Sequence, residues 1–312
     1  MMGESSRTLV DRPDEPRLRR VPCLLGLWCA AALATAVPAF GTSFEDPEFL
    51  IDVWQTEQGL PEDSATSMVQ TPDGYLWFGT FNGLVRFDGV RFSVFDRSNT
   101  PQLPSPGIVN LHLDHSGRLW VSTLLGMACV KDGHWTSYGE DSGWIGNYVR
   151  FSAETRSGEL YFSTYDGKLL HFRGDRFEEV PPPPVPPKIG MMIVVDETDT
   201  LWLINPQFIG RRVGNEWKEA IPVAPLLAGD NANRLMPAAS RSGGLWIATR
   251  EALRRYDHLG RQVYEAPKPP WRKPGFWSAH EDSSGGVWVC THDQGVYHLA
   301  RDEALDIRPI LS

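Results

Sequence analysis

The stretch Asp73-Gly-Tyr-Leu-Trp-Phe-Gly-Thr80 decides the fold, because this turn and the short apolar run after it return five more times along the chain. The later copies are Ser116-Gly-Arg-Leu-Trp-Val-Ser-Thr123, Ser157-Gly-Glu-Leu-Tyr-Phe-Ser-Thr164, Asp199-Thr-Leu-Trp-Leu203, Gly243-Gly-Leu-Trp-Ile-Ala-Thr249 and Gly285-Gly-Val-Trp-Val-Cys-Thr291. Each copy holds one large aromatic residue at the same place, and these anchors are Trp77, Trp120, Tyr161, Trp202, Trp246 and Trp288. They are separated by 43, 41, 41, 44 and 42 residues, and such regular spacing indicates tandem structural repeats.

Each repeat divides into four short runs with turn residues between them. In the first repeat these runs cover residues 65–70, 75–80, 83–87 and 91–95, and Asp-Gly or Asn-Gly pairs supply the positive φ of tight hairpins. The pattern predicts an all-β protein, a β-propeller whose blades are four-stranded antiparallel sheets. The repeats are expected near residues 63–98, 106–139, 147–180, 189–221, 232–266 and 275–310. The aromatic anchors are expected to fill the space between adjacent blades.

The number of blades depends on which segment closes the ring. Residues 51–54, Ile-Asp-Val-Trp, lie where every later repeat has the outer strand of the preceding blade. In a closed ring they would join the last blade and cover its open edge. Residues 303–310 are a second candidate for that same outer strand. The sequence therefore leaves open whether six blades close on themselves or belong to a ring of seven.

The N-terminal 39 residues differ from the rest of the 312-residue chain. Three arginines, Arg17, Arg19 and Arg20, precede an apolar run over residues 21–37, and small residues follow it. This order is typical of a secretory signal, so residues 1–39 are predicted to be a signal peptide or, if uncleaved, an N-terminal anchor. The formal charge of -9, from 30 Lys and Arg against 39 Asp and Glu, argues against a nucleic-acid partner.

The spacing of cysteines and histidines predicts no metal site and no cofactor. Outside the N-terminal segment only Cys129 and Cys290 remain, and both fall inside predicted strands of blades that are not neighbours. They are expected to be buried free thiols rather than a disulfide. The eight histidines form no His-x-x-x-His pair, and the chain holds no phosphate-binding loop, dinucleotide fingerprint or nucleophile elbow.

The residues from Trp54 to Thr80, Trp-Gln-Thr-Glu-Gln-Gly-Leu-Pro-Glu-Asp-Ser-Ala-Thr-Ser-Met-Val-Gln-Thr-Pro-Asp-Gly-Tyr-Leu-Trp-Phe-Gly-Thr, closely resemble the two-component regulator propeller family. The continuation Asn82-Gly-Leu-Val-Arg-Phe-Asp-Gly-Val-Arg-Phe92 strengthens the resemblance, which covers about residues 48–300 and is weakest in the fourth repeat, where Leu203-Ile204 replaces Gly-Thr. The resemblance implies a periplasmic sensor, non-catalytic in itself, of the kind that precedes a membrane span and a histidine kinase, diguanylate cyclase or DNA-binding output. Only 12 residues follow Ala300, so this chain is expected to be a truncated receptor or to act through a separate membrane receptor, kinase or cyclase.

Two other functions stay open, because a propeller fold does not determine activity. One is a secreted glycosidase or polysaccharide lyase, and the other is a passive scaffold that binds protein or glycan. Glycosidic chemistry needs two positioned carboxylates, and no segment of the sequence visibly supplies such a pair. A non-enzymatic sensor of an extracellular small molecule or glycan fragment is therefore the favoured interpretation.

A ligand site is expected where the loops that lead into the inner strands converge on the central axis. The candidate ligand-binding residues on these loops are Asp63, Ser64, Trp144, Asn147, Arg150, Asn233, Arg234, Trp271, Lys273 and Trp277. Trp144, Trp271 and Trp277 lie outside the anchor position of the repeat, so packing between blades explains them less directly. Tryptophan faces beside arginine and asparagine would suit a sugar, although packing of the loops over the blades would explain the same residues.

Overall fold

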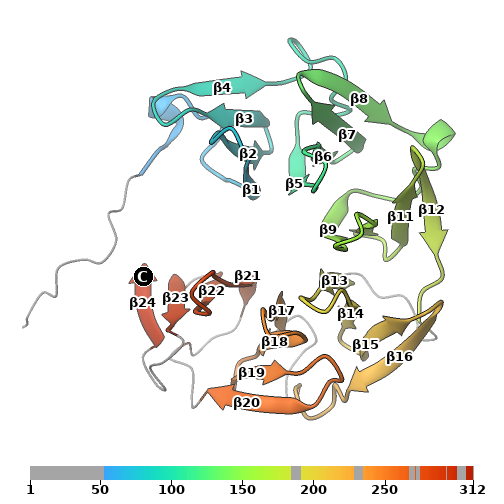
Figure 1. Ribbon diagram of the computed structural model, residues 1–312. Coiled ribbons are helices and arrows are strands. Elements are labelled where there is room, and N and C mark those ends of the chain that lie inside the picture. The colour runs from blue at the N-terminus through green and yellow to red at the C-terminus, as the bar shows by residue number, and fades with distance from the viewer. Residues whose placement is uncertain are drawn as a thin grey trace, which may run out of the picture. The chain divides into compact units, whose positions relative to one another are not determined.

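The chain folds as a β-propeller with six blades, each a four-stranded antiparallel sheet (Figure 1). This computed structural model describes residues 53–183, 191–227, 235–266, 271, 275–292 and 294–300, and the backbone of residues 307–311. The all-β architecture predicted from the repeats is confirmed. Residues 1–39, predicted to be a signal peptide or anchor, lie outside the described residues. Within the described residues, no helix has the length and apolar character needed to cross a membrane.

The strands follow one another in chain order within every blade. Their bounds, blade by blade, are β1 (Ser67–Gln70), β2 (Leu76–Thr80), β3 (Gly83–Phe87) and β4 (Phe92–Phe95); β5 (Ile108–Leu113), β6 (Leu119–Thr123), β7 (Gly126–Lys131) and β8 (His134–Tyr138); β9 (Val149–Glu154), β10 (Leu160–Thr164), β11 (Leu169–Arg173) and β12 (Arg176–Val180); β13 (Met192–Val195), β14 (Leu201–Asn205), β15 (Phe208–Val213) and β16 (Glu216–Ile221); β17 (Met236–Ala239), β18 (Leu245–Ala248), β19 (Leu253–Tyr256) and β20 (Gln262–Ala266); β21 (Phe276–Glu281), β22 (Val287–Thr291), β23 (Val296–Leu299) and β24 (Ile307–Leu311). Two short 3-10 helices, η1 (Thr56–Gln58) and η2 (Glu140–Ser142), lie in the connections before blades one and three.

The aromatic anchors of the second strands form the packing between blades. Trp120 in β6 is 1% exposed, and its ring lies 5.4 Å from Phe162 and 4.6 Å from Phe172, both in the next blade. Trp202 in β14 is fully buried in a cluster that includes Met236 and Ile247 of blade five. Burying such large aromatic surfaces is the main apolar contribution available to radially packed sheets. The role predicted for the anchors is confirmed in blades one to five. Trp288 of blade six instead stacks on His298 of its own blade, with ring centroids 4.3 Å apart.

The blades contact one another in sequence through their inner strands, from β1 to β5, β9, β13, β17 and β21. Among the described residues, no comparable contact joins β21 back to β1, and Figure 1 shows the first and last blades on either side of the opening in the ring. Exposure agrees with this opening. Met68 of β1 is 61% exposed, whereas Leu111 and Ile193, which occupy the same register in blades two and four, are 5% and 3% exposed.

The outer strand of blade six is β24, so residues near the C-terminus occupy the place for which the sequence offered two candidates. Of the competing segment, residues 51 and 52 lie outside the described residues, and Val53 and Trp54 are not in a strand. The Trp54 ring instead packs against blade one, 5.2 Å from Phe87 and 6.5 Å from Phe92. Trp54 therefore covers the face of the first blade that has no neighbour in the ring.

The two cysteines of the propeller are free. Cys129 in β7 is 4% exposed, as expected of a buried thiol, whereas Cys290 in β22 is only half-buried. Burial raises the pKa of the Cys129 thiol to about 12. Cys290 is more accessible because its side chain lies on the face of blade six that adjoins the opening in the ring.

Candidate functional site

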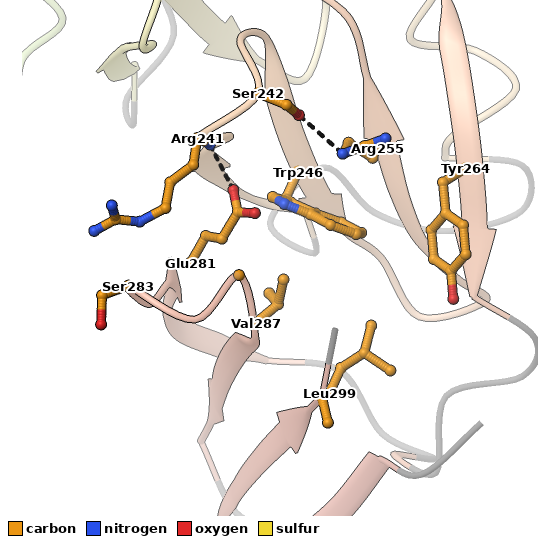
Figure 2. Close-up of a pocket in the computed structure, with 11 residues that line it drawn as sticks. Arg241, Ser242, Trp246, Arg255, Tyr264, Glu281, Ser283, Val287 and Leu299 are labelled. Carbon is orange, nitrogen blue, oxygen red and sulfur yellow. Dashed lines mark hydrogen bonds between the residues drawn. The ribbon is translucent and has the colours of Figure 1, made fainter. Parts of the chain in front are cut away.

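A cavity of about 500 Å³ lies between blades five and six and is the candidate functional site (Figure 2). It opens where the β17–β18 and β21–β22 turns approach each other. Its lining residues are Arg241, Ser242, Trp246, Arg255 and Tyr264 from blade five and Glu281, Ser283, Gly285, Val287, Leu299 and Ala300 from blade six or its edge. Pockets that bind small molecules in proteins have volumes of this order.

Blade five lacks a carboxylate that three other blades place beside the aromatic anchor. In blades two, four and six an aspartate six residues before the tryptophan accepts a hydrogen bond from its indole Nε1–H. The donor-acceptor distances are 2.8 Å for Trp120 and Asp114, 2.9 Å for Trp202 and Asp196, and 2.8 Å for Trp288 and Asp282. Blade five has Ser240 at this position, and its hydroxyl lies 3.0 Å from that of Ser242 instead.

The Trp246 indole is therefore left with an unused donor. Its side chain is 6% exposed, and its Nε1 finds no acceptor among the residues that the structure describes. A buried donor without a partner costs about 1–3 kcal/mol of folding free energy, so proteins keep few of them. Nε1 of Trp246 is a group that a bound molecule could satisfy.

A second unused donor lies on Arg255 of β19, which is the register partner of Trp246. The guanidinium carbon of Arg255 lies 5.7 Å from the centroid of the Trp246 ring, within cation-π range. One terminal nitrogen, Nη1, donates to the Ser242 hydroxyl at 2.8 Å. The buried Nε has no hydrogen-bond partner in the described part of the chain. Two residues that line this cavity therefore each hold a buried N–H group without an acceptor among the described residues.

Blade one also has an arginine as the register partner of its anchor, since Arg86 pairs with Trp77, and its guanidinium carbon lies 5.7 Å from the Trp77 ring centroid. Arginines at other positions near the anchors have carboxylate partners: in blade two Arg118 Nε, in the turn before β6, donates to Asp114 at 2.6 Å, and in blade three Arg173 lies 3.4 Å from a carboxylate oxygen of Glu159. The cavities at the corresponding interfaces are smaller, about 330 Å³ beside Arg118 and about 310 Å³ beside Arg212. Blade five thus combines the largest of these three cavities with an arginine that has no carboxylate partner within the described part of the chain.

The opposite wall carries one carboxylate and several apolar groups. Glu281 at the end of β21 is 8% exposed, and its Oε2 accepts the backbone N–H of Arg241 at 2.6 Å. The Tyr264 ring stands edge-on to Trp246, with centroids 5.8 Å apart and planes at 75°. Val287 and Leu299 complete an apolar side (Figure 2). The arrangement can hold a molecule with an acceptor at one end and hydroxyl donors near Glu281.

The structure separates the three tryptophans that the sequence proposed for a ligand site. Trp144 is 6% exposed and packs edge-on against Phe177, with ring centroids 5.0 Å apart. Trp271 is 2% exposed, and its Nε1 donates to the carbonyl oxygen of Thr249 at 2.9 Å. Trp277 is 66% exposed and lies 4.1 Å from the His292 ring. Only Trp277 of these three offers an exposed ring face.

The polar candidates on the same loops lie at the surface. Asp63 and Ser64 are exposed, and an Asp63 oxygen accepts the backbone N–H of Thr56 at 2.7 Å. Asn147 is exposed and donates its backbone N–H to Asp166 at 3.1 Å. Arg150 is exposed, with its guanidinium carbon 5.7 Å from the Phe151 ring centroid. Asn233, Arg234 and Lys273 lie outside the described residues, and a binding role for this whole set stays a prediction.

The cavity lies at the other end of the inner strands from these loops, and the sequence analysis did not single out its residues. A loop that leads into β17 and the β17–β18 turn are at opposite ends of that strand. A signal was nevertheless present in the repeat. Ser240 stands six residues before the anchor, where three other repeats have aspartate and two have threonine. Positions at which repeats differ from one another are candidates for function.

No group of three His, Cys, Asp or Glu side chains in the described part of the chain is placed to hold a metal ion.

Comparison with known proteins agrees with the fold and with the resemblance noted in the sequence. Residues 59–82 match the profile of the two component regulator propeller family, which confirms that resemblance at the segment that carries it. Among solved structures, the chain is similar to the extracellular domain of a putative hybrid two component system from B. thetaiotaomicron, with a TM-score of 0.62 and 17% sequence identity. That match covers 78% of this chain and 36% of the other.

The fold is shared with enzymes as well. A streptogramin B lyase structure matches with a TM-score of 0.60 and 18% identity over 81% of this chain and 85% of that one. Virginiamycin B lyase from Staphylococcus aureus matches with a TM-score of 0.60 and 15% identity, over 80% and 85% of the two chains. No curated protein sequence matches the chain. At these identities the structural matches establish the propeller fold alone.

Proposed function

We propose that the chain is a ligand-sensing domain of a bacterial signal-transduction system that works outside the cytoplasm, and that it is not itself an enzyme. The observation that carries the proposal is the cavity between blades five and six, lined by Trp246 and Arg255, whose Nε1 and Nε atoms are buried without acceptors among the residues that the structure describes. A sensor must gain free energy from its ligand, and buried unpaired donors provide such a gain when a ligand supplies the acceptor.

The match of residues 59–82 to the regulator propeller profile and the likeness to an extracellular two-component domain support a signalling role. The charged N-terminus and the apolar run over residues 21–37 support export to the periplasm, with or without retention as a membrane anchor. The output is proposed to come from a membrane receptor, kinase or cyclase that reads the state of the propeller.

The test is a thermal-unfolding screen of the purified full chain against sugars, sugar acids, amino acids, glycan fragments and streptogramin B. If the chain is a sensor, at least one compound should raise its melting temperature in a concentration-dependent way. Mass spectrometry of each stabilising compound after incubation distinguishes binding from turnover. A compound that returns unchanged supports the sensor, whereas one that is cleaved or eliminated would support a hydrolase or lyase instead.

Localisation has its own experiment. Alkaline phosphatase is active only outside the cytoplasm, so a fusion to the C-terminus of the full chain should be active. Activity that disappears when residues 1–39 are deleted would support export by this segment. A fusion that stays inactive while the protein accumulates would contradict the periplasmic placement.

A further inference from the structure

We infer that the cavity between blades five and six binds a small hydroxylated carboxylic acid of the sugar-acid type, whose carboxylate accepts hydrogen bonds from Trp246 Nε1 and Arg255 Nε. The inference rests on the proposed sensing function and names the class of ligand and the site. The proposed site lies at the β17–β18 and β21–β22 turns, at the opposite end of the inner strands from the loops that the sequence suggested.

Blade two contains a chemically analogous interaction made within the protein, with an arginine from the turn before β6. One oxygen of the Asp114 carboxylate accepts both Trp120 Nε1 at 2.8 Å and Arg118 Nε at 2.6 Å. An indole and a guanidinium therefore share a single carboxylate oxygen in this fold. Blade five has the indole of Trp246 and a guanidinium from another strand, that of Arg255 on β19, and it has Ser240 in place of the acidic residue. A ligand carboxylate would occupy the place of the missing side chain.

Charge supports a ligand with a single acidic group. The charged residues that line the cavity are Arg241, Arg255 and Glu281. Arg241 is exposed, and Figure 2 shows its guanidinium directed away from Trp246 and Arg255. One carboxylate would neutralise Arg255, whereas a second acidic group would approach the buried Glu281 and be repelled. A monoacid fits this balance.

The other walls favour hydroxyl groups on the rest of the ligand. Glu281 has one oxygen committed to the Arg241 backbone N–H, and its second oxygen can accept from a hydroxyl. Tyr264, Val287 and Leu299 offer apolar surface to the carbon face of a sugar ring. A cavity of about 500 Å³ has room for a monosaccharide acid with bound water.

The experiment is calorimetric titration of the purified full chain with D-glucuronate, D-glucose and acetate. D-glucuronate should bind most tightly, because it alone combines the carboxylate with the hydroxylated ring. D-glucose lacks the acceptor for Trp246 and Arg255, and acetate lacks the ring. Equal affinity for glucuronate and glucose would overturn the role of the two donors, and absence of glucuronate binding would overturn the ligand class.

The decisive variant is Ser240→Asp, which restores the carboxylate found in blades two, four and six. It should satisfy Trp246 and Arg255 internally and weaken glucuronate binding about tenfold or more, the usual effect of losing a hydrogen bond to a charged group. The matched control is Ser93→Asp, which adds the same charge on an exposed position of β4 and should leave affinity unchanged. Undiminished binding by Ser240→Asp would refute the site.

A second variant keeps the test informative if Ser240→Asp fails to fold. Trp246→Phe keeps an aromatic ring at the anchor but removes the Nε1–H, so it should also weaken glucuronate binding about tenfold. If the ligand screen finds another compound whose binding neither variant alters, the sensing function stands and this site is wrong. If no compound stabilises the chain at all, the sensing function fails together with the site.

Discussion

The Nε1–H of Trp120 donates a 2.8 Å hydrogen bond to the carboxylate of Asp114, six residues earlier in the chain. The same carboxylate accepts the backbone N–H groups of Ser116 and Arg118, so it fixes the turn that precedes β6. Asp114 is 4% exposed. Burial opposes its ionisation, but hydrogen bonds from Trp120, Ser116 and Arg118 outweigh burial and lower the pKa of Asp114. One buried charge thus connects a turn, an anchor and the packing between two blades.

Replacing the Asp114 carboxylate should destabilise the protein. Asp114→Ala leaves the Trp120 N–H buried and unpaired and removes the partner of Arg118, so the free energy of unfolding should fall by about 3 kcal/mol. Urea unfolding followed by tryptophan fluorescence measures the loss. Asp88→Ala is the control, because Asp88 is an exposed turn aspartate that accepts the backbone N–H groups of Val90 and Arg91. Similar losses from both variants would contradict the special role of Asp114.

The same aspartates predict how stability depends on pH. Asp114 and Asp282 both have a pKa below the ordinary value of 3.8, since hydrogen bonds to the charged form outweigh the opposing effect of burial. A carboxylate with a lowered pKa in the folded state stabilises the protein fully above its unfolded pKa, and this contribution is lost as the pH falls toward the folded pKa. The urea concentration at the midpoint of unfolding should therefore decrease as the pH is lowered below about 4.

Asp114→Asn supplies the control for this pH dependence, because it removes one of the titrating groups while keeping the shape of the side chain. The variant should be less stable than the wild type near neutral pH and should lose less stability on acidification. An unchanged slope of stability against pH in this variant would show that other carboxylates govern the acid transition.

Much of the fold could be predicted because it is encoded locally. The turn and anchor around Trp77 recur with a spacing that only a repeated blade explains, and the strands lie where alternating residues and Asp-Gly turns placed them. The pairing of Trp246 with Arg255 was not predictable in the same way. It depends on the register between β18 and β19 and on the absence of an aspartate at Ser240, which has meaning only once the other blades show what that position does.

The loop tryptophans show a second limit of sequence reasoning. Trp144 and Trp277 both lie outside the repeat position, and sequence gives no basis for ranking their exposure. The two rings have different neighbours: Trp144 packs against Phe177 in a buried cluster, whereas the exposed Trp277 lies beside His292. Contacts between segments distant in sequence decide such burial, so the loops were the least predictable part of the site.

These two tryptophans should respond differently to truncation. Trp144→Ala removes a buried ring from the cluster of Phe162 and Phe177 and should lower the free energy of unfolding by about 3–5 kcal/mol. Trp277→Ala removes a largely exposed ring, so stability should change by about 0.5 kcal/mol or less. Urea unfolding of the two variants side by side tests this difference. A large loss for Trp277→Ala would show that its ring supports the fold.

The two cysteines should differ in reactivity toward a thiol-specific maleimide. Cys129 is buried and burial raises its pKa to about 12, so almost no thiolate forms near neutral pH in the native state. Cys290 is half-buried beside the opening in the ring and should react first. Mass spectrometry of peptides after brief labelling, with a urea-unfolded sample as the reference, assigns each site. Rapid native labelling of Cys129 would mean that blade two opens readily.

The turn that borders the cavity depends on a glycine. Gly244 has a φ of 84°, and its backbone N–H donates at 2.7 Å to Asp196 of blade four, so it links two blades. A methyl group at this position would collide with the backbone carbonyl oxygen of Tyr256. Gly244→Ala should therefore destabilise the protein by more than the cost of positive φ alone, which is about 1–2 kcal/mol for a non-glycine residue.

Gly74→Ala is the matched control for that prediction. Gly74 lies in the equivalent turn region of blade one with a φ of 91°, but no atom lies within 4 Å of an added methyl group. The control isolates backbone strain, and the difference between the two variants measures the close approach of the β17–β18 turn to Tyr256. Equal losses in urea unfolding would mean that the turn can shift to relieve the collision. A larger loss for Gly244→Ala would establish that this wall of the cavity is held rigidly by its neighbours.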